Sequence, residues 1–74
     1  MDSNVIWSVE IDEGSFKAWV TSLSNEKGTL TVESKDGVHK FTKEVYLGYG
    51  APFGPDIEDV NYWADLSLKF IDSL

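Results

Sequence analysis

The fold of this chain is decided by residues 5–20, which read VIWSVEIDEGSFKAWV. Apolar and polar residues alternate with a period of two on both sides of Glu13-Gly14, which is typical of a β-hairpin with one buried face. A two-residue turn at Glu13-Gly14 gives a definite register. One face then carries three apolar pairs: Ile11 with Phe16, Val9 with Ala18 and Trp7 with Val20. The other face carries Glu10 with Lys17 and Ser8 with Trp19, so both faces make favourable cross-strand pairs.

Two further turn signals extend this hairpin into a meander. Asn25-Glu26-Lys27-Gly28 predicts a turn in which Gly28 takes a left-handed conformation, and a third strand is expected over residues 29–35. Asp36-Gly37 is a strong hairpin signal, and it places Val32 opposite Phe41 and Glu33 opposite Lys40. The fourth strand should continue to about Leu47. We expect four antiparallel strands with one buried face and one face in water.

The spacing changes to a helical one near the C-terminus. Residues 48–55 are rich in glycine and proline, and Pro55 suits the first position of a helix. Acidic residues in the first turn also favour a helix start there. The predicted apolar stripe of this helix is Val60, Trp63, Ala64, Ser67, Phe70, Ile71 and Leu74, with Tyr62 and Leu66 at or beyond its edge. The opposite, solvated side is Glu58, Asn61, Asp65, Lys69 and Asp72.

Packing this stripe on the inner face of the meander gives one α+β domain over residues 1–74, in the order ββββα. The side chains expected to face the helix are Val5, Trp7, Val9, Ile11, Phe16, Val20, Leu30, Val32, Phe41, Val45 and Leu47. Ile6 is expected on the opposite, outer face of the sheet.

Composition limits the classes to which the chain can belong. Its 74 residues suffice for one small domain. Three Trp, three Tyr and four Phe make it too aromatic for a disordered segment. No apolar run approaches the roughly 18 residues of a membrane span, and residues 1–4 lack the basic start of a signal peptide. Without cysteine the core alone must stabilise the fold. We expect a cytoplasmic protein with no membrane partner.

No arrangement typical of catalysis, metal binding or cofactor binding is found in the sequence. His39 is the single histidine, and it has no evident catalytic partner. The carboxylate clusters at residues 10–13 and 56–59 lack the spacing of a calcium loop. The glycines of residues 48–54 are too widely spaced for a dinucleotide-binding turn. We therefore predict no catalytic residue, no metal and no cofactor.

Two clusters of aromatic residues are candidates for binding. Trp19 is expected on the outer face, flanked by Ile6 and Leu23, and exposed Trp is enriched in interface hot spots. A one-residue slip of register at residues 25–28 would instead turn Leu23 inward and divide this cluster. Tyr49 and Phe53 lie in the glycine-rich loop. They either present a binding loop or fill the end of the core.

The net charge is −7, from thirteen acidic residues and six lysines with no arginine, which disfavours direct contact with nucleic acid. The charge is also uneven: residues 1–16 carry four acids and no base, residues 17–43 carry a net +2, and residues 44–74 carry a net −5. Glu58, Asp65 and Asp72 recur every seven residues and so nearly align on the helix. They join Glu10 and Asp12 in one acidic surface only if both elements project the same way. Such a surface attracts a basic partner, although acidic charge also serves solubility alone.

The leading hypothesis is a non-catalytic module that binds a basic surface of another protein. Its most concrete form is an inhibitor that competes with nucleic acid for a nuclease or a nucleic-acid-guided complex. In size and charge the chain resembles small acidic phage anti-restriction and anti-CRISPR proteins and bacterial immunity proteins, a resemblance of composition that transfers no residue roles. The expected contact residues are Glu10, Asp12, Trp19, Tyr49, Phe53, Glu58, Tyr62, Asp65 and Asp72.

The alternative is a structural or assembly module that self-associates through the exposed sheet face or edge, as a homodimer for example. Trp19, Ile6 and Leu23 would then carry the contact. A small-molecule site around Tyr49 and Phe53 is a third hypothesis, and it requires a concave pocket there.

Overall fold

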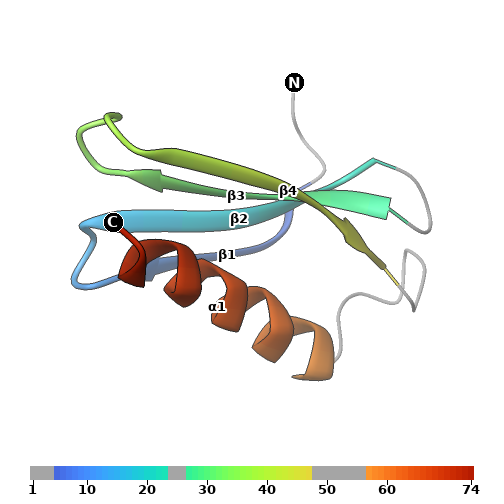
Figure 1. Cartoon of the computed structure of the whole chain (residues 1–74). Helices are drawn as coiled ribbons and strands as arrows, with labels where there is room; N and C mark the ends of the chain where they lie inside the picture. The colour runs from blue at the N-terminus through green and yellow to red at the C-terminus, as the bar shows by residue number, and fades with distance from the viewer. Residues whose placement is uncertain (1–4, 24–26, 48–56) are drawn as a thin grey trace.

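A computed structural model describes residues 5–23, 27–47 and 57–74 of the chain (Figure 1). Four strands form one antiparallel sheet in sequential order: β1 (Val5–Ile11), β2 (Phe16–Ser22), β3 (Lys27–Ser34) and β4 (Lys40–Tyr46). One helix follows in the described residues, α1 (Ile57–Asp72). The predicted α+β fold with the order ββββα is therefore confirmed. Within the part of the chain that the structure describes, no helix is long and apolar enough to cross a membrane.

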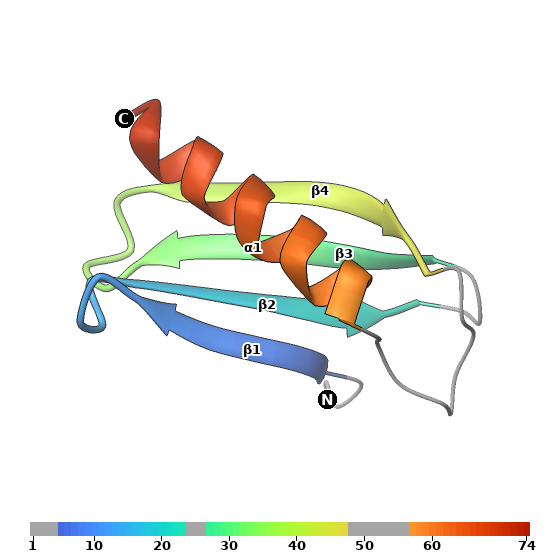
Figure 2. The ribbon, with the colours of Figure 1, turned by 90° about the horizontal axis from the view of Figure 1, so that it is seen from below.

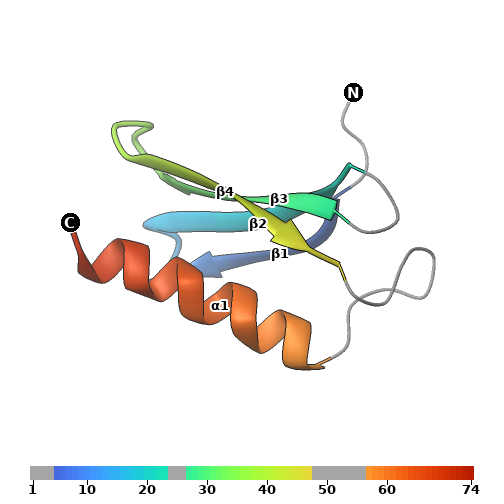
Figure 3. The same ribbon diagram turned by 45° about the vertical axis from the view of Figure 1, so that its right-hand side comes forward.

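The helix covers one face of the sheet, and no other described element covers the opposite face (Figures 1 and 3). Figure 2 shows α1 crossing the strands obliquely, from above β2 at its N-terminal end to beyond β4 at its C-terminal end. Two aromatic contacts agree with this path. Trp63 lies against Trp7 of β1 with ring centroids 5.7 Å apart, and Phe70 stacks on Phe41 of β4 at 4.8 Å.

The core forms where α1 meets β2, β3 and the C-terminal end of β4. Its buried hydrophobic residues are Ala18, Val20, Leu30, Val32, Val45, Leu47 and Trp63. Ser67 is fully buried as well, because its hydroxyl donates a hydrogen bond of 2.8 Å to the Trp63 carbonyl one turn earlier. The Trp63 indole N–H finds no acceptor among the described residues, so apolar burial rather than hydrogen bonding holds this side chain.

The predicted register of β1 and β2 is confirmed from Trp7 to Ile11, but it is wrong at the start of β1. A β-bulge falls between Val5, which pairs with Thr21, and Trp7, which pairs with Val20. The extra residue reverses the expected faces. Ile6 packs against the core, and Val5 is half exposed on the outer side. The run Val5-Ile6-Trp7 is apolar throughout, so alternation alone could not locate this change of face.

The two outer turns lie where predicted. The Ser15 N–H donates to the Asp12 carbonyl at 3.1 Å, which closes the predicted two-residue turn at Glu13-Gly14, whereas the β3–β4 turn is longer than predicted. β1 and β2 are joined by the four residues 12–15, and φ is positive at Asp12, Glu13 and Gly14. The β3–β4 hairpin has the predicted pairs Val32 with Phe41 and Glu33 with Lys40. The Ser34 N–H donates a hydrogen bond to the His39 carbonyl and closes this hairpin, so the loop contains four residues. Of the pair Asp36-Gly37, Gly37 alone has a positive φ, so the turn is not of type I′.

Gly28 is not the left-handed turn residue that we expected. It lies inside β3, paired with Ser22 on one side and Val45 on the other, and it is buried without a positive φ. A Cβ at this position would stand 2.8 Å from the Thr21 carbonyl oxygen. The glycine is therefore required by the close approach of β2, and residues 24–26 of the predicted turn lie outside the described residues.

We predict that Gly28→Ala lowers the free energy of unfolding by about 1–3 kcal/mol, because the added methyl group forces β2 and β3 apart. Urea denaturation measures this loss. Thr42→Ala on the exposed side of β4 is the control, and it should cost less than about 1 kcal/mol. Equal stabilities of Gly28→Ala and wild type would contradict the close approach.

Candidate functional site

The outer face of the sheet carries a row of alternating charges across all four strands. The register places Glu10 opposite Lys17, Lys17 opposite Glu33, and Glu33 opposite Lys40. Opposite charges in directly paired positions attract each other across strands. Including Lys27 and Glu44, the outer face carries three lysines and three acidic residues, so this face is close to neutral.

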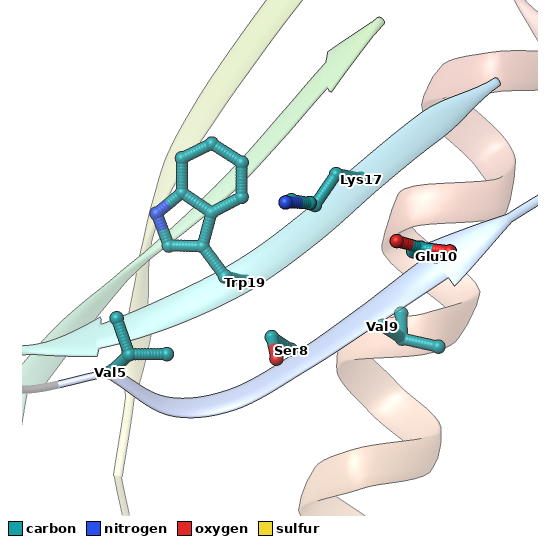
Figure 4. A pocket seen from close by; sticks show the side chains of 6 residues that line it. All are labelled: Val5, Ser8, Val9, Glu10, Lys17 and Trp19. Carbon is teal, nitrogen blue, oxygen red and sulfur yellow. The ribbon is translucent and has the colours of Figure 1, made fainter. Parts of the chain in front are cut away.

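Trp19 stands beside this row at the rim of an open hollow (Figure 4). The hollow has a volume of about 590 Å³ and is lined by Val5, Ser8, Val9, Glu10, Lys17 and Trp19. Trp19 is half-buried, and Val5, not the expected Ile6, is its apolar neighbour. Leu23 is exposed, so the register slip that would have turned it inward does not occur. The bulge in β1 is what divides the predicted cluster of Trp19, Ile6 and Leu23.

The solvent side of α1 carries the acidic residues that the sequence predicted there. Glu58, Asp65 and Asp72 are all exposed. Asp65 forms an ion pair of 3.2 Å with Lys69, and both side chains are well exposed. An exposed pair of this kind contributes about 0–1 kcal/mol. Tyr62 is 50% exposed at the edge of the same surface, which places an aromatic ring beside the carboxylates.

The predicted joint acidic surface is not formed. Glu10 lies on the outer face of the sheet, whereas α1 packs on the inner face and directs its acidic residues away from the sheet. Asp12 is exposed in the β1–β2 turn, at the end of the sheet. The structure therefore brings Glu58, Asp65, Asp72 and Tyr62 onto one element and separates Glu10 and Trp19 from them. Tyr49 and Phe53 lie outside the described residues.

Sequence reasoning missed Val5 and Lys17 as neighbours of Trp19. Lys17 could have been found, because the predicted register already placed it two residues from Trp19 on the same face. Val5 could not, because its position depends on the bulge.

A metal ion in a protein requires several side chains that converge on one point. No group of three or more His, Asp or Glu residues among the described residues converges in this way. His39 is exposed beside the β3–β4 turn, and its backbone N–H donates to the Ser34 hydroxyl at 3.0 Å.

Asp36 is held in that same turn by local hydrogen bonds. The Ser34 hydroxyl donates to its carboxylate at 2.6 Å, and the Val38 N–H donates to the same oxygen at 3.0 Å. These hydrogen bonds favour the charged carboxylate and lower the pKa of Asp36 below its ordinary value of 3.8. The Ser34 hydroxyl has the largest effect, and the Val38 N–H has the next largest. The carboxylate therefore acts as a structural element of the turn.

Comparison of the chain with protein-family models, with curated proteins and with solved structures finds no match.

The Asp36 carboxyl should titrate below pH 3.8, and its contribution to the turn should follow that titration. Because the folded pKa is lowered, this contribution is complete above pH 3.8 and is lost as the pH falls through the lowered value. Carboxyl-carbon NMR measures the midpoint. Ser34→Ala should move the midpoint upward toward 3.8, because the largest cause is removed. An unchanged midpoint in that variant would contradict the assignment.

Proposed function

We propose that this chain is a non-catalytic module that binds a basic surface of another protein through the solvent side of α1. One observation carries the proposal: the negative charge of the described residues is concentrated on the helix and not on the sheet. The helix has four acidic residues and Lys69 as its one lysine, whereas the outer face of the sheet has three of each sign.

The geometry of the helix gives this surface a regular form. Glu58, Asp65 and Asp72 are two turns apart, which corresponds to about 10.5 Å between neighbours at the α-helical rise. The three carboxylates thus extend over roughly 21 Å along one side of the helix. Lys69, paired with Asp65, lies on the same side, so the row is predominantly acidic and keeps a net negative charge. A surface of this kind steers an oppositely charged partner and raises its association rate at low ionic strength.

Tyr62 adds an exposed aromatic ring to this acidic surface. Its ring is half exposed next to the acidic row, and Tyr is enriched among the residues that dominate interface energies. We propose that Tyr62 makes most of the short-range contact with the partner, while the carboxylates orient the partner and raise the association rate.

A nucleic-acid-binding protein is the partner class that we propose. Such proteins expose Lys and Arg to hold phosphates, and a row of carboxylates competes for the same side chains. Inhibition of a nuclease or of a nucleic-acid-guided complex, as phage anti-defence and nuclease-immunity proteins achieve it, is the most specific form of this proposal. The cytoplasmic compartment stays a prediction from the sequence.

Self-association through the outer sheet face is the second candidate, and a specific observation favours it. Val5 is 51% exposed beside Trp19, so an apolar edge of the hollow faces solvent. Val5→Ser should then dissociate any dimer seen in sedimentation, whereas a monomer at millimolar concentration would exclude this candidate.

The helix proposal is tested with two variants of equal charge. Glu58→Gln with Asp65→Asn and Asp72→Asn neutralises the helix row, and Glu10→Gln with Glu33→Gln and Glu44→Gln neutralises three carboxylates of the sheet. Fluorescence anisotropy with a labelled deca-lysine peptide, the defined basic probe, measures binding from 20 to 300 mM salt, conditions that span about 20 Å to 6 Å of Debye length. We expect at least tenfold weaker binding for the helix variant and less than threefold for the sheet variant at low salt.

A native partner extends the same test. Proteins captured from the host lysate by wild type should be lost with the helix variant, retained by the sheet variant, and released by added duplex DNA. Equal loss of deca-lysine binding in both variants would contradict the proposal, since the net charge of the chain, and not the helix row, would then determine the affinity.

A further inference from the structure

The two edges of the sheet are protected to different degrees. Among the described residues β1 and β4 are the edge strands, and each has one row of backbone N–H and C=O groups with no neighbouring strand in that part of the chain. β4 carries Lys40, Lys43 and Glu44, and Lys43 lies opposite Leu30 on the helix side, an inward charge that discourages a further strand. β1 reads VIWSVEI, with Glu10 as its one charge and with no lysine or proline. Its bulge is confined to the stretch from Val5 to Trp7, so the pairing is regular from Trp7 to Ile11.

The backbone of β1 presents defined groups to this open edge. The Leu23 N–H donates to the Lys27 carbonyl at 2.9 Å and the Lys35 N–H donates to the Ser15 carbonyl at 2.8 Å, one at each end of the β2–β3 pairing. Every second residue of β2, namely Lys17, Trp19 and Thr21, therefore directs its backbone groups toward β3. The intervening residues of β2 direct their backbone groups toward β1. Ala18, for example, is paired with Val9 of β1. By the same alternation, the backbone groups of Ser8 and Glu10 point away from β2, toward the open edge.

The side chains along this edge define what a fifth strand should carry. Glu10 ends the alternating row of charges and has Lys17 as its one cross-strand neighbour, so a basic residue opposite Glu10 would continue the alternation. On the other face, Val9 is 37% exposed although it belongs to the apolar side of β1. An apolar residue beside Val9 would cover it. A residue opposite Ser8 would lie over the hollow at Trp19 (Figure 4).

We propose that the β1 edge accepts an extended segment of a partner protein as a fifth strand, with a Lys or Arg opposite Glu10 and apolar residues on either side of it. Strand addition of this kind takes affinity from backbone hydrogen bonds and specificity from alternate side chains. The proposal does not rest on the function proposed for α1, because the two surfaces lie on different elements.

A second copy of this chain fits the edge less well. β1 contains no basic residue, so no pairing of β1 with β1 places a positive charge opposite Glu10. The antiparallel pairing centred on Val9 sets Ser8 there, and two chains of charge −7 also repel each other. Charge complementarity therefore favours a basic segment of another protein.

The probe is the peptide Thr-Val-Lys-Val-Thr-Val-Thr, and its control has Glu in place of Lys. Titration of the labelled full chain followed by amide NMR should show saturable shifts of Ser8 and Glu10, with the Glu peptide at least tenfold weaker. Glu10→Lys should reverse that preference. Absence of saturable shifts with either peptide, or equal affinity for both, would overturn the proposal.

Two proline variants separate edge docking from loss of fold. Ser8→Pro removes an outward N–H of β1, and Thr42→Pro does the same on β4, where the Ser34–His39 hydrogen bond sets the alternation. We expect at least tenfold weaker peptide binding for Ser8→Pro and less than twofold change for Thr42→Pro, with near-wild-type far-ultraviolet circular dichroism in both. Should sedimentation instead show a dimer that Ser8→Pro dissociates, the occupant is a second copy and the proposal is overturned.

Discussion

The contact between Trp63 of α1 and Trp7 of β1 determines the arrangement of both layers. Trp63 is fully buried, and burying an aromatic side chain removes about 150–250 Å² from water, which stabilises by roughly 4–6 kcal/mol as an upper limit. An exposed ion pair such as Asp65–Lys69 contributes about 0–1 kcal/mol. The apolar contact therefore sets which side of α1 meets the sheet. The acidic side faces solvent as a consequence.

That arrangement leaves two surfaces of different character on the described part of the chain. The helix offers carboxylates in a row with few lysines beside them, and the sheet offers balanced charges that end at the open edge of β1. The first suits long-range attraction, which salt screens, and the second suits short-range backbone pairing. We propose basic partners for both surfaces, the first through its row of carboxylates and the second through Glu10 alone.

The sequence predicted the elements well because their signals are periodic and local. Alternation located the four strands, and the seven-residue spacing of Glu58, Asp65 and Asp72 placed them on the solvent side of α1. Two features were not accessible from periodicity. The bulge at Ile6 lies within an apolar run, and Gly28 is needed because of a neighbouring strand. Both are decided by tertiary contact. The separation of Glu10 from the helix row already follows from the predicted faces, because α1 covers the inner face and Glu10 lies on the outer face.

Trp63 holds α1 on the inner face of the sheet, and the positions of both proposed surfaces depend on this contact. Comparing the urea denaturation of Trp63→Ala and Trp19→Ala tests it most directly, because both variants remove the same side chain from opposite faces. We predict a loss of about 3–5 kcal/mol for Trp63→Ala, enough to unfold a small domain. Trp19→Ala should lose less, since Trp19 is half-buried at an open hollow. Equal losses in the two variants would contradict the account.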